Sequence, residues 1–270
     1  MTTTVEKIFL EMDRARVQGD LIFKESPTDK EYHFQNWVGD RISACGIPFD
    51  DPGRNTYPDF RLVNEPLGIE VKGLAFPGRQ DNYDSNSQVP TGHHNERDVY
   101  YVFGRYPKSE VGVAEYPVID LVMCHGSFLN SNSDYVHKNR SFRGFGSYGD
   151  IMVRDRKMYV VPTPYFLVDN TAGKFTLILP DSFSGVSDQL VHVGDLERKE
   201  VSKEVVGYHF DLQTNEISTT LADYKGTGQV HTFRAYRSRE SNREPQVHMS
   251  TKAKEFEREL EQKYNTENDI

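Results

Sequence analysis

The chain has 270 residues, of which 36% are hydrophobic and 27% charged, and its formal net charge at neutral pH is −9. This composition supports one large globular domain and excludes a largely disordered chain, while the acidic total argues against a protein that coats DNA regardless of sequence. No apolar run is long enough to span a membrane and the first residues lack a secretory signal pattern, so we expect a cytoplasmic protein without membrane contact. Cys45 and Cys124 have no metal-ligand spacing and are expected to be buried thiols.

Amphipathic helices are predicted near the start of the chain. Capping-box pairs, each followed by apolar residues at helical spacing, predict helices over residues 4–17 and 29–45. In the second helix Glu31 is the capping partner of Thr28. The residues of 49–57, rich in Asp, Pro, Gly and Asn, then predict a loop.

Residues 57–73 predict a β-hairpin, because two apolar arms flank a turn that contains Asn, Pro and Gly. Glu70 and Lys72 are two residues apart, so in strand geometry they point to the same face. Asp59 enters from the start of the neighbouring strand. A twisted hairpin can therefore bring two carboxylates and one ammonium together at one edge of a sheet.

This trio has the chemistry of phosphodiester hydrolysis. Two nearby carboxylates bind a hard cation such as Mg²⁺, which prefers oxygen ligands. The metal polarises a phosphoryl oxygen and lowers the pKa of bound water, and a lysine beside it stabilises charge on the phosphate or orients the attacking water. The alternative is a surface hairpin on which Glu70 and Lys72 form a solvated charge pair. The otherwise apolar hairpin favours the functional interpretation.

The same residues resemble a known motif. Pro58-Asp59, ten intervening residues and Glu70-Val71-Lys72 are similar to the motif of the PD-(D/E)XK nuclease superfamily, to which type II restriction endonucleases belong. The resemblance implies that Asp59 and Glu70 bind Mg²⁺, that the backbone carbonyl of Val71 is a further metal ligand, and that Lys72 assists catalysis.

The resemblance covers residues 28–76 and implies an α/β (α+β) fold, a mixed central β-sheet flanked by helices with a restriction-endonuclease-like core. We expect a single nuclease domain over 1–270. Its catalytic core spans about 28–125, and 126–270 supplies sheet extensions, DNA-contacting loops and a C-terminal helix. In some members an acidic residue of the first core helix joins the metal site; Glu31 is the candidate here, unless it only caps the helix.

Two polar segments are predicted to contact DNA, although either could be a solvated surface loop. Segment 76–98 lies next to the catalytic edge, where long polar loops often serve recognition or act as lids. Segment 127–157 is rich in Asn, Ser, Gly and aromatics, and residues 138–158 hold six basic and two acidic residues, a net charge of +4. The candidate DNA contacts in the two segments are Arg79, Gln88, His93, His94, Asn95, Arg97, Lys138, Asn139, Arg140 and Arg143.

The later chain predicts further strands and one helix. A second basic segment, 225–243, has five basic residues and one acidic residue and could grip the DNA backbone from the other side of a cleft. Residues 251–264 predict an amphipathic helix for packing or dimer contact, since its basic and acidic residues cancel. No pattern assigns 184–204. Apolar, β-branched runs predict strands over 99–106, 116–124, 158–168, 174–179 and 205–210.

The residues and the resemblance together predict a Mg²⁺-dependent, sequence-specific endonuclease of a prokaryotic cytoplasm. It would cleave double-stranded DNA as a homodimer and leave 5′-phosphate ends. Long insertions rich in Asn, Arg, Gly and His favour a type II restriction enzyme that cuts a palindrome. One alternative is a structure-selective or repair nuclease of the same fold, such as a junction resolvase or exonuclease. The other is a non-catalytic DNA-binding module, against which the intact trio argues.

Overall fold

The computed structural model describes residues 2–24, 32–50, 53, 56–86, 88–108, 113–132, 147–154, 158–241 and 246–266. Its elements in chain order are α1 (Thr4–Gln18), β1 (Ile22–Phe23), α2 (Tyr32–Ala44), β2 (Phe49–Asp50), β3 (Phe60–Leu62), β4 (Leu67–Phe76), β5 (Asn82–Asn86), β6 (His93–His94), β7 (Arg97–Pro107), β8 (Glu115–Tyr116), β9 (Asp120–His125), the 3₁₀ helix η1 (Gly126–Phe128), β10 (Met152–Arg154), β11 (Met158–Pro162), α3 (Pro164–Leu167), β12 (Val168–Asp169), β13 (Phe175–Pro180), β14 (Leu190–Lys199), β15 (Lys203–Asp211), β16 (Glu216–Asp223), β17 (Val230–Ser238), β18 (His248–Met249) and α4 (Thr251–Thr266). The capping box of Thr3 and Glu6 forms at the start of α1 as predicted.

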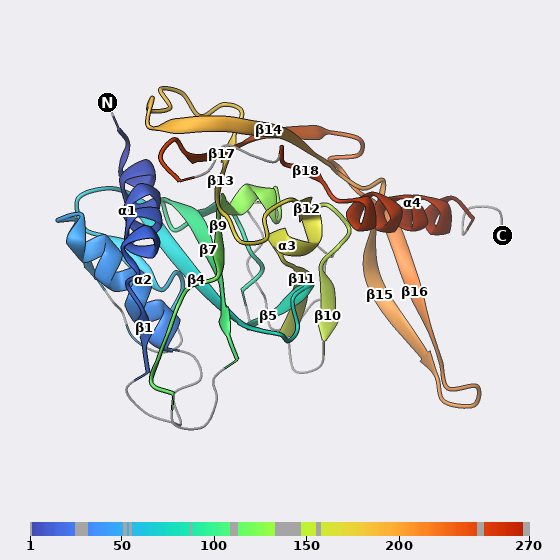
Figure 1. Ribbon diagram of the computed structural model, residues 1–270. Helices are drawn as coiled ribbons and strands as arrows, with labels where there is room; N and C mark the ends of the chain where they lie inside the picture. The colour runs from blue at the N-terminus through green and yellow to red at the C-terminus, as the bar shows by residue number, and fades with distance from the viewer. Residues whose placement is uncertain are drawn as a thin grey trace.

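A nine-stranded sheet forms the centre of the molecule (Figure 1). Its strand order is β14-β17-β13-β9-β7-β4-β3-β2, and β6 also pairs with β7. The β4–β7 and β9–β13 pairs are parallel, whereas the remaining pairs of this sheet are antiparallel. The predicted α+β class, with a mixed central sheet flanked by helices, is therefore confirmed.

Hydrophobic layers cover both faces of the sheet. On one face, Phe9 of α1 and Val38 of α2 are fully buried together with Val102 of β7. On the other face, Tyr101 and Phe103 of the same strand pack with η1, α3, β5 and β11. Successive residues of β7 thus serve opposite layers, as the period of a strand requires.

Some stretches differ from the sequence prediction. The predicted strand 158–168 is β11 followed by helix α3, because Pro164 is well suited to the first turn of a helix. The polar stretch 76–98, expected as loops, contains β5 and β6, and β5 pairs with β11 in a separate sheet that includes β10. The unassigned stretch 184–204 contains β14. Pairing with a neighbouring strand satisfies the backbone hydrogen bonds of these polar sequences and overrides weak strand propensity.

Two features lie at the periphery. Strands β15 and β16 form a ribbon that projects from the body of the molecule beside α4 (Figure 1). Helices α1 and α2 lie together at the opposite side of the molecule. Within the described part of the chain, every helix is too short or too polar to cross a membrane.

Candidate functional site

The predicted hairpin is formed by β3 and β4, which pair in antiparallel fashion. Ile69 and Val71 belong to the hydrophobic layer under α1 and α2. The alternating residues Glu70 and Lys72 therefore point to the opposite face of the sheet. The register, continued by one residue, sets Asp59 beside Glu70.

Hydrogen bonds fix these side chains relative to one another. The backbone N–H of Asp59 donates to Glu70 Oε2 at 3.2 Å, and the N–H of Val71 donates to Asp59 Oδ2 at 2.8 Å. The Lys72 ammonium donates to Glu70 Oε1 at 2.7 Å. The structure thus brings Asp59, Glu70 and Lys72 together at the start of β3, where the hairpin prediction sets them.

The oxygen atoms of this site fit a hard cation. The N–H and C=O of one strand residue point to the same neighbouring strand, so the Val71 carbonyl faces the side on which Asp59 lies. Two carboxylates and one carbonyl are ligands that Mg²⁺ accepts alongside water. Among the described residues, no group of three or more His, Cys, Asp or Glu side chains could hold a metal ion. Water or substrate oxygens would therefore have to complete the coordination.

Tyrosines form the buried side of the site. The hydroxyl oxygens of Tyr57 and Tyr101 lie 2.7 Å apart, and Lys72 Nζ lies 5.8 Å from the centroid of the Tyr83 ring. Burial raises the pKa of all three phenols, and the charge of Glu70 adds to the effect. The three hydroxyls are therefore neutral at neutral pH.

Tyr83 and Tyr101 are not among the site residues that the sequence predicts. Tyr101 lies beside Glu70 through the parallel β4–β7 register, and Tyr83 is carried by β5 of the separate sheet. Neither pairing leaves a local signal, because each depends on which strands become neighbours.

Two of the predicted DNA contacts in 76–98 make local contacts. Arg79 forms an ion pair with Asp84 at 2.7 Å, and both side chains are partly exposed. The side-chain amide of Gln88 donates to the carbonyl of Val89 at 2.9 Å. Strand β5 holds this part of the segment in place, so it is more ordered than a loop prediction implies.

The turn between β6 and β7 carries the next candidates. The His94 ring packs edge-to-face on Tyr57, with centroids 4.9 Å apart, and burial lowers the pKa of His94. His93 is exposed beside Asp98, with Nδ1 3.3 Å from a carboxylate oxygen. Asn95 occupies the turn with φ of 47°. Of these residues, His94 lies closest to the candidate site through its contact with Tyr57.

Arg97 is engaged within the protein. Its guanidinium donates to the carbonyls of Leu62 (2.9 Å) and Glu65 (3.1 Å), so it holds the turn of the β3–β4 hairpin. The remaining predicted site residues lie outside the described residues: Glu31, Lys138, Asn139, Arg140 and Arg143.

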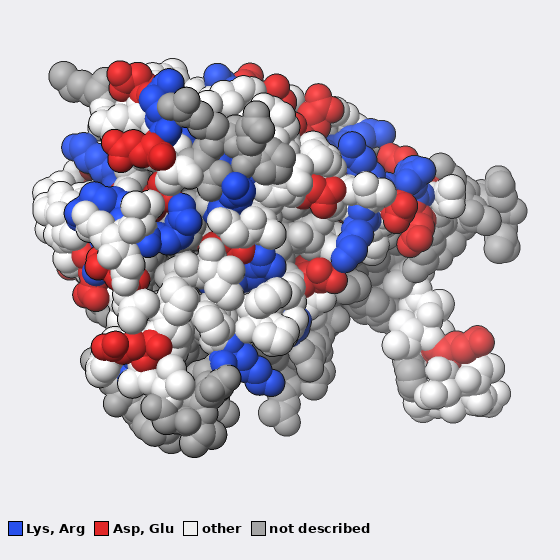
Figure 2. All heavy atoms as spheres, in the orientation of Figure 1, with Lys and Arg blue, Asp and Glu red and all other residues white. Residues whose placement is uncertain are grey.

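Two basic residues of the second basic segment, 225–243, are engaged within the protein. Arg237 is fully buried and donates to the carbonyl of Asn170, and Arg234 pairs with Asp181 at 2.8 Å. Arg237 is not available to contact DNA, because β17 is an interior strand of the sheet and alternate side chains are buried by packing. Figure 2 shows basic and acidic side chains intermingled on the visible face of the molecule.

Comparisons of this chain with protein-family models, with curated proteins and with solved structures find no match. Its function is therefore inferred from the chemistry of the site.

Proposed function

We propose that the chain is a Mg²⁺-dependent endonuclease that hydrolyses phosphodiester bonds of double-stranded DNA. The observation that carries this proposal is the convergence of Asp59, Glu70 and Lys72 within hydrogen-bond distance on the β3–β4 hairpin. Burying charged groups on an otherwise apolar hairpin costs desolvation free energy. Catalysis explains such a cluster better than packing does.

The carboxylates of Asp59 and Glu70 and the carbonyl of Val71 would hold Mg²⁺, which when bound supplies Lewis-acid stabilisation of the phosphate and a bound water of lowered pKa. The hydrogen bonds from backbone N–H groups to both carboxylates restrict their rotation. Ligands held in this way need little rearrangement when the ion arrives.

Lys72 would stabilise the negative charge that develops on the phosphate. Its ion pair with Glu70 holds the ammonium at the edge of the site, where 24% of the Lys72 side chain remains exposed. The tyrosines behind it exclude water and lower the local dielectric constant, which strengthens the interaction of an ammonium with phosphate. The 3′ oxygen leaves and the phosphate stays on the 5′ end of the product.

We further propose a type II restriction enzyme, in which two copies of the chain cut a palindromic site in a prokaryotic cytoplasm. A structure-selective nuclease of the same fold is the second candidate. The observation that favours this second candidate is that Gln88 and Arg97 donate to backbone carbonyls and Arg79 is paired with Asp84, which leaves fewer groups in 76–98 to read bases.

Cleavage of a large unmethylated DNA with Mg²⁺, followed by sequencing of the ends, tests the proposal. Defined fragments with 5′-phosphate ends at one repeated sequence are expected from the wild-type chain. Lys72→Met should reduce the rate by about 10²–10³-fold. Cleavage only at branches or free ends would support the second candidate. No cleavage by the wild-type chain, or equal rates with and without Lys72, would rule out nuclease chemistry at this site.

A further inference from the structure

The β15–β16 ribbon lacks the support that a ribbon normally needs. Its strands pair only with each other within the described part of the chain, and both outer edges are left open. A two-stranded ribbon by itself is marginally stable in water, whereas packing on another surface stabilises it. Large apolar side chains near its tip are exposed, with Leu212 85% and Ile217 66% accessible. Exposed apolar side chains at the end of a projecting element indicate a binding surface.

The strand register makes the ribbon amphipathic. Residues directly opposite in an antiparallel pair share a face. One face carries the apolar residues Val205, Leu221 and Ile217, with the ion pair of Lys203 and Asp223 (2.5 Å) at its base. The other face carries the pairs Glu204–Ala222, Gly207–Thr220, His209–Ser218 and Asp211–Glu216, which are mainly polar. One face of the ribbon is therefore suited to contact with another protein surface.

Both ends of the ribbon are held by specific contacts. At the tip, Asp211 Oδ1 accepts hydrogen bonds from the N–H groups of Gln213 (2.7 Å) and Thr214 (3.2 Å). At the base, the N–H of Tyr224 donates to the carbonyl of Ser202 at 3.1 Å.

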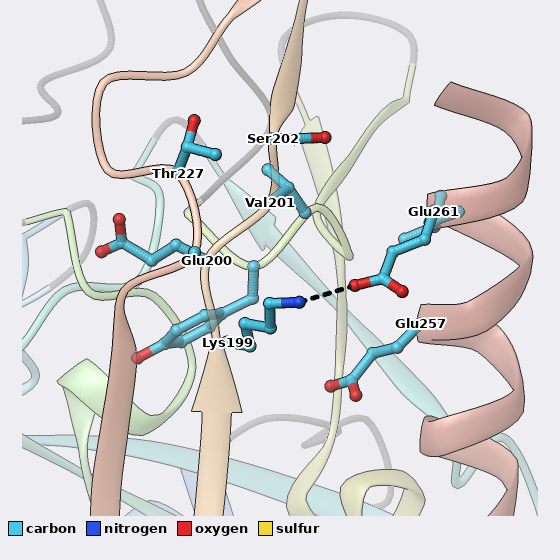
Figure 3. Close-up of a pocket in the computed structure, with 10 residues that line it drawn as sticks. Lys199, Glu200, Val201, Ser202, Thr227, Glu257 and Glu261 are labelled. Carbon is cyan, nitrogen blue, oxygen red and sulfur yellow. Dashed lines mark hydrogen bonds and ion pairs between the residues drawn. The ribbon is translucent and has the colours of Figure 1, made fainter. Parts of the chain in front are cut away.

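The strand that leads into the ribbon is tied to the body as well. Figure 3 shows Lys199, at the end of β14, pointing to Glu261 of α4, and the two charged groups lie 3.1 Å apart. The cavity around them, of about 130 Å³, is also lined by Glu200 and Glu257, and burial raises the pKa of Glu257. An anionic ligand is therefore disfavoured in this cavity, and the Lys199–Glu261 ion pair links β14 to α4 at the base of the ribbon.

The charge of the ribbon excludes nucleic acid as its partner. The ribbon, residues 203–223, contains one basic residue, Lys203, which pairs with Asp223 at 2.5 Å, and four acidic residues, Glu204, Asp211, Glu216 and Asp223. Figure 2 shows the projecting tip as largely uncharged, with one acidic patch. Proteins that place β-ribbons on DNA need cations against the phosphates. The exposed apolar side chains Leu212 and Ile217 instead suit contact with a protein surface.

The surface area that the ribbon can bury favours a second copy of this chain over an unrelated protein as its partner. A ribbon with strands of nine and eight residues is about 30 Å long and about 10 Å wide, so one of its faces covers about 300 Å². One such contact buries about 600 Å² on the two partners together, below the range of specific interfaces. Two copies that exchange ribbons bury about 1,200 Å², which reaches that range. Two-fold symmetry supplies the second contact without any additional surface.

We infer that the β15–β16 ribbon is a dimerisation arm that packs on the body of a second copy of this chain. This inference rests on the proposed function, which explains why two copies are needed. Each chain carries one Asp59–Glu70–Lys72 site, and a duplex has two strands to cut. The arm holds two such sites in one particle.

Measuring the molecular mass of the protein in solution tests the dimerisation arm independently of any DNA cleavage. Sedimentation equilibrium of the full chain, without DNA or Mg²⁺, is expected to show a dimer at micromolar concentration. The double change Leu212→Ser and Ile217→Thr should raise the dissociation constant at least about 100-fold, since both side chains lose burial in both arms. Val17→Thr on α1 is the matched control, because Val17 is as exposed as Ile217, at 66%, and it should leave the dimer intact.

A second variant guards against misfolding of the first. Deletion of Gly207–Phe210 together with Ile217–Thr220 removes four cross-strand pairs and keeps Asp211, whose carboxylate holds the tip, so the shortened hairpin can still close. This variant should be a monomer with unchanged helix and sheet content by circular dichroism. A monomeric wild-type chain, an unchanged dissociation constant in both arm variants, or equal loss in Val17→Thr would overturn the inference. A dimer that depends on the arm but does not cleave DNA would instead refute the proposed nuclease function and leave the arm in place.

Discussion

Each acidic residue of the candidate site makes structural contacts as well as supplying metal-binding oxygens. Asp59 accepts the N–H of Val71, and Glu70 accepts the N–H of Asp59 and the ammonium of Lys72. These contacts hold the carboxylates in place, and the negative charge of the carboxylates would attract a cation. Substitutions that remove the charge of a carboxylate but keep its shape separate its structural role from its metal-binding role.

Asp59→Asn and Glu70→Gln should abolish Mg²⁺-dependent cleavage, by at least about 10³-fold, because an amide is a poor ligand for a hard cation. Stability should change by no more than about 1 kcal/mol, since the amide oxygen still accepts the backbone N–H. Single-turnover cleavage and urea denaturation measure the two quantities. DNA binding in Ca²⁺ serves as the control and should persist. A variant that cleaves near the wild-type rate would show that these carboxylates do not bind the catalytic metal.

His125 predicts a specific pH dependence of stability. Burial lowers its pKa from 6.5 to about 4, and its ring Nδ1 lies 2.6 Å from Ser127 Oγ at the start of η1. The unfolded chain binds this proton below pH about 6.5, whereas the folded chain binds it only below about 4. The free energy of unfolding should therefore fall as the pH is lowered through this window, by up to about 3 kcal/mol, and be fully restored above it.

The measurement compares wild type with His125→Asn, because Asn can still cap η1 but does not titrate. Urea denaturation at intervals from pH 4 to 7 should give a shallower pH slope in the variant. Identical slopes would mean that His125 titrates normally in the folded state.

At the scale of elements, the site depends on how closely β3 and β4 approach. Strand β4 pairs in parallel with β7 along its whole length, so Glu70 and Lys72 lie on an interior strand of the sheet. A site on a paired strand is held more rigidly than one on a loop. Arg97 adds to this rigidity through its bonds to the carbonyls of the hairpin turn.

Gly68 lies where β4 packs most tightly against the residues that precede β3. A Cβ atom at Gly68 would lie 2.3 Å from Cγ of Pro58, a buried ring that cannot rotate away. Gly68→Ala should therefore destabilise the fold by about 1–3 kcal/mol through overpacking. It should also lower the cleavage rate, because Pro58 precedes Asp59.

The matched control is Gly207→Ala in strand β15, where a Cβ atom would meet only ordinary contacts at 3.6 Å. It should leave both stability and cleavage unchanged. Urea denaturation and cleavage assays on the two variants provide the comparison. Equal behaviour of Gly68→Ala and wild type would mean that the hairpin adjusts without disturbing the site.

At the scale of the molecule, the net charge of −9 opposes approach to DNA. Binding therefore requires a local basic surface. In segment 225–243, Arg237 is buried and Arg234 is paired within the protein. The net-positive stretch 138–158 remains the source that the sequence predicts.

Arg140→Ala and Arg143→Ala test this surface. If either residue contacts a phosphate, its loss should weaken binding about equally on all sequences and make the salt dependence shallower by about one unit. If it reads a guanine, its loss should cost about 1–3 kcal/mol on the cognate site alone. Fluorescence anisotropy on cognate and random duplexes, in Ca²⁺ and across a salt series, distinguishes the two. Wild-type affinity of both variants on both duplexes at every salt concentration would move recognition to 76–98.

The sequence by itself determined the local elements and the local part of the site. Capping and apolar spacing located α1, apolar spacing located α4, and turn residues between apolar arms located the β3–β4 hairpin. The same short-range geometry put Glu70 and Lys72 on one face and brought Asp59 beside them. These features were predictable because each depends on residues close in the chain.

Only the tertiary structure decided which distant segments meet. The parallel β4–β7 register brought Tyr101 to Glu70, and the β5–β11 sheet brought Tyr83 to Lys72. The interior position of β17 buried Arg237, and β15 and β16, which pair only with each other among the described strands, form a projecting ribbon. Strand propensity is a local quantity, whereas the choice of neighbouring strand and the burial of a side chain depend on the whole sheet, so no local pattern could reveal them.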